Sequence, residues 1–228
     1  MCRRTCQGEL DLELLQDFNA AAIAETDGCG YLHPGDIPHR LFNGNKHFDP
    51  AEVMTIWEDG IGVAAWVLTS PRFKCYDAQV RPDLRGNDFE REVLEYADAR
   101  TVELMHKQNI DADHFYTDAY QCDTDRSRLL LELGWKLENQ ANYMVPRASL
   151  DDVDEPVFPE GYTIRAVSGV EEAAAVAGVH FAAFPKAGWT PELFGKLWRP
   201  PAMLQNVSLS SSLRMEPSSP SRIHGTTI

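Results

Sequence analysis

The stretch Val80-Arg-Pro-Asp-Leu-Arg-Gly-Asn-Asp-Phe89 decides how the rest of this chain is interpreted. A β-rich run over residues 73–80 leads into it, and apolar residues at helical spacing follow it over residues 89–107. We therefore expect a strand, a tight turn and a helix N-terminus. Backbone N–H groups at such a junction lie beside the positive end of the helix dipole, which suits a pyrophosphate. Gly86 would let the backbone approach that ligand, and Arg85 would supply positive charge.

The sequence before this stretch predicts a helix and a hairpin. Leucine, phenylalanine and alanine recur at the 3.6-residue period over residues 9–24, which is typical of a helix with one buried face. Residues 26–50 are rich in Gly, Pro, Asn and His and are interpreted as loop. The β-rich runs 53–57 and 61–68 flank Glu58-Asp59-Gly60, a pattern that predicts a β-hairpin.

The sequence after the central helix predicts a strand, a short helix and a last strand. Residues 114–120 are a candidate strand. Asp123 or Thr124 is suited to cap a helix that ends at Gly134. Residues 135–145 then alternate well enough to form a final strand or hairpin.

A second unit is predicted to follow. Residues 161–167 begin it as a strand, and Ser168 with Glu171 three residues later is interpreted as a capping box. Residues 8–23 align weakly with residues 169–184, which indicates a tandem repeat. One face of the second unit's helix is formed by Ala173, Ala177, Phe181 and Phe184.

Composition and charge exclude several classes of protein. The 228 residues are 43% hydrophobic and 25% charged, which is typical of a globular chain. The formal net charge of −14, from 35 acidic and 21 basic residues, repels phosphate groups, so we expect no nucleic-acid partner and no membrane partner. No apolar run reaches the roughly 18 residues of a membrane span.

The five cysteines and the first residues indicate a compartment. The cysteines are irregularly spaced and include no CxxC pair, and residues 1–8 contain no hydrophobic stretch of the kind found in signal peptides. We therefore expect a reduced, cytoplasmic protein with free thiols. Cys75 lies on a predicted buried strand and is interpreted as a core thiol, not a nucleophile.

Taken together, the order of these elements and two short motifs resemble the GNAT superfamily of acyl-CoA-dependent N-acetyltransferases. The Val-x-Pro-x-x-Arg-Gly segment, residues 80–86, is similar to that family's coenzyme A-binding motif. Leu133-Gly134-Trp135 is similar to its usual Leu-Gly-Phe. The resemblance spans residues 9–146, and the tandem layout is similar to that of the mycothiol synthase-like branch.

The resemblance implies an α/β fold in which helices flank a mixed, strongly twisted sheet. A splay between two central strands takes the pantetheine arm of acetyl-CoA, and an amine of a small molecule or peptide attacks the thioester directly. The end of the strand at Val80 binds pantetheine through its backbone. The residues implied to hold the pyrophosphate are Arg85, Gly86, Asn87, Asp88 and Phe89.

The chain departs from the family pattern at three positions. Where the family motif continues with small residues, this chain has Asp88 and Glu90. Like charges a few ångströms from a pyrophosphate cost roughly 1–4 kcal/mol at a surface-like dielectric. The family's general-acid tyrosine falls on Leu130, which cannot protonate a leaving thiolate.

The catalytic groups are therefore left open at this point. The candidate acids are Tyr116, Tyr120 and Tyr143. The candidate bases are Asp77 and Asp118. A metal site is not expected, because a polar loop explains the histidines and aspartates at His33, Asp36, His39, His47 and Asp49.

These observations divide the chain into four parts and leave three hypotheses. Residues 1–147 form a GNAT-like domain with a clipped first strand, 148–160 a linker, 161–204 a partial second GNAT-like domain and 205–228 a disordered tail. The first hypothesis is an N-acetyltransferase of unknown amine substrate. The second is a degenerate, inactive GNAT-like binding or scaffold module, which the acidic residues and Leu130 favour. The third is a truncated product whose active half is missing.

Overall fold

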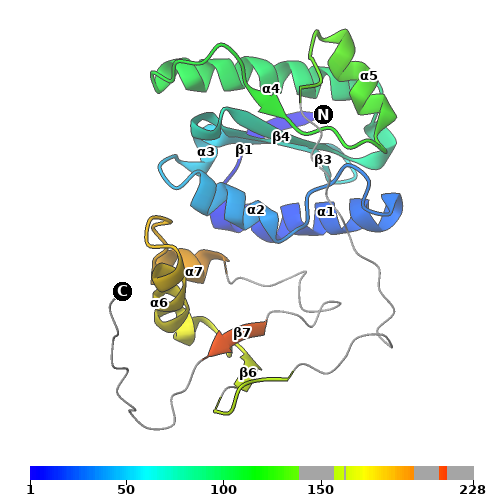
Figure 1. Cartoon of the computed structure of the whole chain (residues 1–228). Coiled ribbons are helices and arrows are strands. Elements are labelled where there is room, and N and C mark those ends of the chain that lie inside the picture. The colour runs from blue at the N-terminus through cyan, green and yellow to red at the C-terminus, as the bar shows by residue number, and fades with distance from the viewer. Residues whose placement is uncertain (139–156, 162, 198–210, 215–228) are drawn as a thin grey trace.

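The computed structural model describes residues 1–138, 157–161, 163–197 and 211–214. Its main feature is a sheet with the strand order β1-β2-β3-β4-β5 and helices on both faces (Figure 1). Successive strands from β1 to β4 pair antiparallel, and β5 pairs parallel to β4. The expected α/β fold with a mixed, helix-flanked sheet is therefore confirmed. The strands are β1 Cys2–Thr5, β2 Met54–Glu58, β3 Val63–Ser70, β4 Cys75–Val80 and β5 Tyr116–Thr117.

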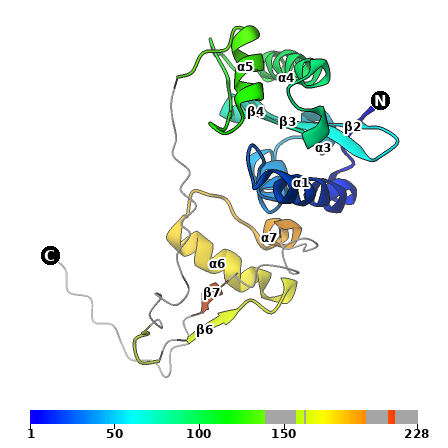
Figure 2. The same ribbon diagram turned by 90° about the vertical axis from the view of Figure 1, so that its right-hand side faces the viewer.

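The helices form two layers. Figure 2 shows α1 against one face of the sheet, and α4 and α5 against the other. The helices and helical turns of this part are η1 Gly8–Asp11, α1 Leu12–Thr26, α2 Asp36–Pro38, η2 His39–Gly44, α3 Pro50–Val53, η3 Pro71–Phe73, η4 Pro82–Leu84, α4 Asp88–Lys107 and α5 Thr124–Glu132.

The side chains of β4 alternate between these two layers, as the pleat of a strand requires. Tyr76, Ala78 and Val80 lie in the hydrophobic core beneath α4. Asp77 and Gln79 point to the opposite face, where they bond to the segment between α1 and β2. The polar face of β4 therefore lies beside that segment.

Several predicted elements agree with the structure. The hairpin is formed by β2 and β3, and the third strand by β4. Asp123 caps α5 by accepting the N–H of Arg126, and Gly134 follows that helix with a φ of 91°. The central helix α4 buries the predicted residues Val93, Ala97, Leu104 and Met105.

The first residues, in which no β pattern was recognised, form the short strand β1. β1 pairs antiparallel with β2 over all four of its residues. Arg4 of β1 forms ion pairs with Asp11 and Glu58. The strand was not recognised because it lies at the edge of the sheet and is mostly exposed, so it needs no alternation of apolar residues.

Two other expectations change in detail. The segment 26–50 contains the short helical turns α2 and η2, which bury Ile37 and Leu41. The strand expected over residues 114–120 is reduced to β5. Residues 135–138 are not a strand, and the remainder of the predicted strand or hairpin lies outside the described residues.

The second unit contains the predicted strand and helix. Its described elements are β6 Thr163–Ala166, η6 Val170–Glu172, α6 Ala173–Ala183, α7 Pro191–Leu197 and β7 Ser211–Arg214. β7 pairs antiparallel with β6, so part of the segment expected to be disordered forms a strand. This pairing arises from main-chain bonds to a distant strand, which local composition does not reveal. Other residues of the predicted linker and tail lie outside the described ranges.

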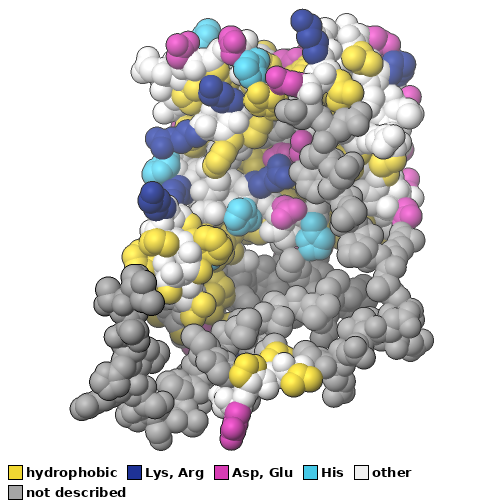
Figure 3. Space-filling model, viewed as in Figure 1, with side chains coloured by type: hydrophobic (Ala, Val, Ile, Leu, Met, Phe, Trp, Pro, Cys, Tyr) yellow, Lys and Arg dark blue, Asp and Glu magenta, His cyan; other side chains and the backbone are white. Residues whose placement is uncertain are grey.

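Two details of the second unit correct the sequence analysis. Glu172, not Glu171, accepts the N–H of Ser168. Of the predicted apolar face, Ala173 and Ala177 are buried, whereas Phe181 and Phe184 are 59% and 62% exposed. Figure 3 shows hydrophobic side chains gathered over α6 and α7. Among the described helices, none is both long and apolar enough to cross a membrane.

Candidate active site

β4 and β5 diverge almost as soon as they pair. They are paired only at Cys75 with Tyr116 and at Tyr76 with Thr117, while β4 continues to Val80. A cavity of about 10 Å³ lies at this divergence. That volume is room for about one water molecule. Its lining includes Asp77, Gln79, Thr117, Asp118, Tyr120 and Arg126.

Asp77 is the buried acid of this cavity. Its side chain is 6% exposed, and one carboxylate oxygen lies 2.5 Å from Nη1 of Arg40. Burial raises the pKa of Asp77 to about 6, against the opposing effect of the Arg40 cation. The nearby charges of Asp118 and Asp36 raise that pKa further. A carboxyl group with a pKa near 6 can accept a proton at neutral pH, as a general base must.

Arg40 is held in place by the turn that carries it. The side-chain amide of Asn45 donates to the Arg40 carbonyl at 3.1 Å and to the Ser70 hydroxyl at 2.8 Å. Asn45 is 2% exposed, so these bonds tie η2 to the end of β3 in the interior. The segment interpreted as loop therefore supplies the cation that faces Asp77.

The predicted junction between β4 and α4 is present, and we call residues 81–87 the Gly86 turn. Gly86 has a φ of 72°, in the left-handed region that favours glycine. Asn87 caps α4, because its side-chain oxygen accepts the N–H groups of Phe89 and Glu90. The strand, turn and helix N-terminus are thus arranged as the sequence predicted.

The carboxylate of Glu90 is bonded to the Gly86 turn. Glu90 is fully buried, and its Oε2 accepts the Gly86 N–H at 2.6 Å. Its Oε1 lies 2.7 Å from Nη2 of Arg126, which is also buried. A carboxylate of the chain therefore takes up a backbone N–H just before the N-terminus of α4. Asp88, by contrast, is exposed.

Two carbonyl groups of β4 at the divergence are also bonded within the chain. The hydroxyl of Tyr31 donates to the carbonyl of Val80, and Arg126 donates to that of Ala78 at 2.5 Å. Burial raises the pKa of Tyr31 to about 12, so its hydroxyl keeps the donated proton at neutral pH. The Val80 carbonyl, expected to bind pantetheine, is thus engaged with Tyr31 in this structure.

Arg85 likewise has partners within the chain. Its guanidinium forms an ion pair with Asp123, donates to the Cys29 carbonyl at 2.9 Å, and lies over the ring of Tyr31. Gly30 has a φ of 85°, and a Cβ at this residue would collide with the Arg85 guanidinium. Arg85 is therefore directed away from the Gly86 turn and toward the loop that follows α1.

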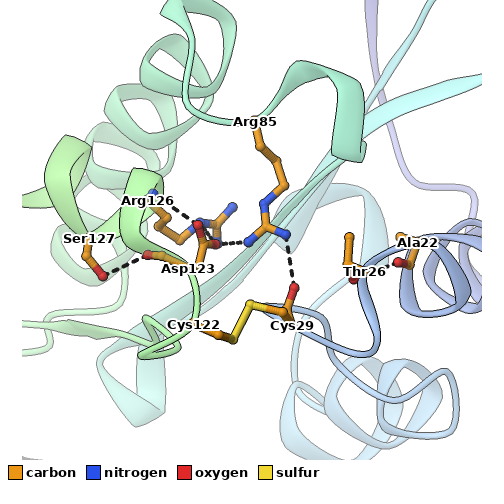
Figure 4. The surroundings of a disulfide bond; sticks show 8 residues. All are labelled: Ala22, Thr26, Cys29, Arg85, Cys122, Asp123, Arg126 and Ser127. Atoms are coloured by element: carbon orange, nitrogen blue, oxygen red, sulfur yellow. Dashed lines mark hydrogen bonds and ion pairs between the residues drawn. A yellow bond between two sulfur atoms is a disulfide. The ribbon is translucent and has the colours of Figure 1, made fainter.

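A disulfide joins Cys29 to Cys122 beside this ion pair (Figure 4). The two Cα atoms are 6.0 Å apart although 93 positions separate the residues in sequence. This corrects the expectation that all thiols are free, whereas Cys2, Cys6 and Cys75 are free in the structure. Sequence spacing did not reveal the pair, because the loop after α1 meets the segment after β5 only in the folded sheet.

The remaining candidates are distributed differently. Tyr120 and Asp118 line the cavity with Asp77, whereas Tyr116 is 41% exposed and bonds to His114. Tyr143 lies outside the described residues. Cys75 is half-buried and not a core residue as expected, and burial raises the pKa of its thiol to about 12.

Metal ligation gives no candidate site in the part of the chain that the structure describes. Within it, no three His, Cys, Asp or Glu side chains are grouped so that they could hold a metal ion. The site residues that the sequence analysis missed are Tyr31, Arg40, Cys29, Cys122 and Arg126. None of them belongs to a local motif, and each acts on a residue far away in sequence.

Replacing Gly86 with Ala tests the turn itself. The Cβ would lie 2.9 Å from the side chain of Asp125, and the backbone would stay in the left-handed region. We expect the free energy of unfolding to fall by about 1–3 kcal/mol, measured by denaturant titration. Gly178→Ala in α6 is the matched control, since its Cβ meets nothing within 4 Å, and it should not destabilise. Equal losses in both variants would contradict this account of the turn.

Comparison with known proteins gives a likeness to solved structures alone. No protein-family model and no curated protein match the sequence. The fold is similar to a crystal structure of a GCN5-related N-acetyltransferase from Sphaerobacter thermophilus. The TM-score is 0.45 and the sequence identity 18%, over 85% of this chain and 61% of that one. This chain therefore spans less than two thirds of the length of that protein.

Proposed function

We propose that this chain is an acyl-CoA-dependent N-acetyltransferase that transfers an acetyl group from acetyl-CoA to an amine. The observation that carries the proposal is Asp77, a buried carboxyl group with a pKa of about 6 where β4 and β5 diverge. An amine attacks a thioester only through its unprotonated nitrogen. A base with this pKa at the divergence supports that chemistry.

In the proposed acetyl transfer, Asp77 and Tyr120 have separate roles. The amine nitrogen attacks the carbonyl carbon of the thioester, and Asp77 accepts the proton that the nitrogen loses, directly or through one water. The carbon–sulfur bond then breaks, and the thiolate leaves and takes up a proton. Tyr120 is the candidate donor of that proton, because it alone of the described candidate tyrosines lines the cavity with Asp77.

The donor groups around the Gly86 turn fit a diphosphate. The Gly86 N–H and the Arg126 guanidinium both contact the Glu90 carboxylate, next to the start of α4. A phosphate group of acetyl-CoA would use the same donors once Glu90 is displaced, and Arg85 would add a second cation. The proposal keeps the residues that the sequence predicts to bind acetyl-CoA, which are Val80, Arg85, Gly86, Asn87, Asp88 and Phe89.

The acceptor is proposed to be a cationic amine. Asp77 is joined near the divergence by Asp36 and Asp118, whose charges act on it. The chain as a whole carries a net charge of −14, so its field attracts cations and disfavours anionic acceptors. A polyamine or a peptide amino group has the required charge.

The test is acetyl transfer from acetyl-CoA to a panel of monoamines, polyamines and peptide N-termini, with products identified by mass spectrometry. Transfer to at least one cationic amine supports the proposal. If neither the oxidised nor the reduced protein binds acetyl-CoA, the proposal is overturned, and the binding or scaffold module is left as the explanation of the fold.

The dependence of the rate on pH follows from the same residue. Because Asp77 must be ionised to accept a proton, we expect kcat/KM to fall about tenfold per pH unit below a pH of about 6. Arg40→Gln removes the cation that opposes the raised pKa, so the acidic limb should move to higher pH. If the acidic limb of the pH profile of kcat/KM does not move in Arg40→Gln, a group other than Asp77 is responsible for it.

A further inference from the structure

We propose that the Cys29–Cys122 disulfide is a thiol-exchange site that controls access of acetyl-CoA to its proposed binding site at the Gly86 turn and the cavity. Oxidised, it holds the site closed; reduced, it lets the site open. This inference rests on the proposed transferase function. It assigns a small thiol as the reactant and the bond between Cys29 and Cys122, hereafter the clamp, as its target.

The position of the clamp supports this role. It joins the loop after α1 to the segment between β5 and α5 (Figure 4). Residues of both segments line the cavity at the divergence of β4 and β5. Gly30, next to Cys29, and Tyr120, two residues before Cys122, both line the cavity with Asp77. The clamp therefore fixes the distance between two walls of the proposed site.

A continuous series of contacts leads from the clamp to the Gly86 turn. Arg85 binds the carbonyl of Cys29 and the carboxylate of Asp123, the neighbour of Cys122. Asp123 lies 3.8 Å from Arg126 in the same helical turn, and Arg126 holds Glu90 on the Gly86 N–H. Both cysteines are thus linked through these contacts to Arg126 and to Glu90 at the Gly86 turn.

With the disulfide formed, the site has no room for acetyl-CoA. A cavity of about 10 Å³ holds about one water and cannot hold a pantetheine arm. Arg85 and Arg126, the two cations proposed to meet the phosphates, are both engaged with carboxylates of the chain. Separating the two loops would release Arg85 from Asp123 and widen the cavity, so that both cations could meet a diphosphate.

The clamp is accessible to a reductant. Cys122 is exposed, whereas Cys29 is half-buried. A thiolate attacks the Cys122 sulfur, forming a mixed disulfide and releasing the Cys29 thiolate. A second thiolate then attacks the external sulfur of the mixed disulfide, so the reductant leaves as its own disulfide and Cys122 as a thiolate. Two reductant thiols are oxidised and one protein disulfide is reduced.

The experiment measures binding of desulfo-CoA, which has no thiol and cannot itself reduce the clamp, to the full chain by calorimetry. Peptide mapping first verifies the bond in the oxidised protein. We expect dithiothreitol-reduced protein to bind about 5–150-fold more tightly than oxidised protein. The double variant Cys29→Ser, Cys122→Ser should bind like the reduced protein whether or not reductant is present. Cys2→Ser, which removes an exposed free thiol, should keep the wild-type response.

Each other result contradicts the proposal in a distinct way. Equal binding by oxidised and reduced protein overturns the clamp but leaves the transferase standing. Binding by neither form overturns both. Circular dichroism of reduced wild-type protein checks that it stays folded, and amide exchange gives a readout that needs no variant. Exchange of the Gly86 amide should be faster after reduction, and unchanged protection there would also overturn the clamp.

Discussion

Replacing Asp77 with Asn is expected to lower kcat/KM for acetyl transfer by about 10²–10⁴-fold, the usual contribution of a general base. The amide keeps the shape of the side chain and its contact with Arg40 but cannot accept the amine proton at neutral pH. Binding of acetyl-CoA should be unchanged, because no phosphate-binding donor is altered. Steady-state kinetics together with calorimetry separate the two effects.

The stability of the same variant provides an independent check. The pKa of Asp77 is raised from 3.8 to about 6 on folding, so the folded chain binds this proton more tightly than the unfolded chain. Its ionisation therefore lowers stability as the pH rises from about 4 to about 6, by up to about 3 kcal/mol at neutral pH. Asp77→Asn should consequently be at least as stable as wild type at pH 7, with the advantage vanishing near pH 4.

Asp118→Asn is the matched control for the choice of base. Asp118 lines the same cavity but is exposed to water, so its loss should change the rate far less than loss of Asp77. If the Asp118 variant loses more activity, the base assignment is wrong. If Asp77→Asn is both inactive and unfolded, the activity loss has no bearing on catalysis.

Replacing Arg126 with Met is expected to lower the free energy of unfolding by about 3–5 kcal/mol, the usual effect of leaving a buried charge unpaired. Glu90 would stay fully buried with the Gly86 N–H as its partner and no cation beside it. The carbonyl of Ala78 would also lose one donor and keep the side-chain amide of Gln79. Urea titration followed by circular dichroism measures the loss.

Two further variants make this prediction specific. Adding Glu90→Gln to Arg126→Met removes the unpaired charge and keeps an oxygen for the Gly86 N–H, so about half or more of the loss should return. Arg128→Met on the same helix removes only exposed contacts, with Glu132, Asp125 and the Gly86 carbonyl, and should cost less than about 1 kcal/mol. A loss of that small size in Arg126→Met would mean that water reaches Glu90.

The two acidic residues of the motif show what local sequence does not predict. Asp88 and Glu90 were expected to oppose a pyrophosphate in the same way, because both stand where the family has small residues. In the structure Asp88 is exposed and Glu90 is buried against Arg126, 36 positions later. Only the partner on α5 distinguishes the buried acid from the exposed one.

The sequence by itself determined the hairpin, the β4 strand, the Gly86 turn, α4 and the cap of α5. Each of these depends on residues within a few positions of one another: alternation in a strand, the helical period, a capping side chain or a glycine with positive φ. The same local rules identified Asp77 as a candidate base without choosing it over Asp118.

Tertiary structure alone decided which groups meet at the divergence. Asp77 contacts Arg40 across 37 positions, Tyr31 reaches the Val80 carbonyl across 49, and Cys29 meets Cys122 across 93. These residues meet only after the sheet has brought the loop following α1 beside the segment following β5. Burial, which raises the pKa of Asp77, also exists only once both layers of helices are packed on the sheet.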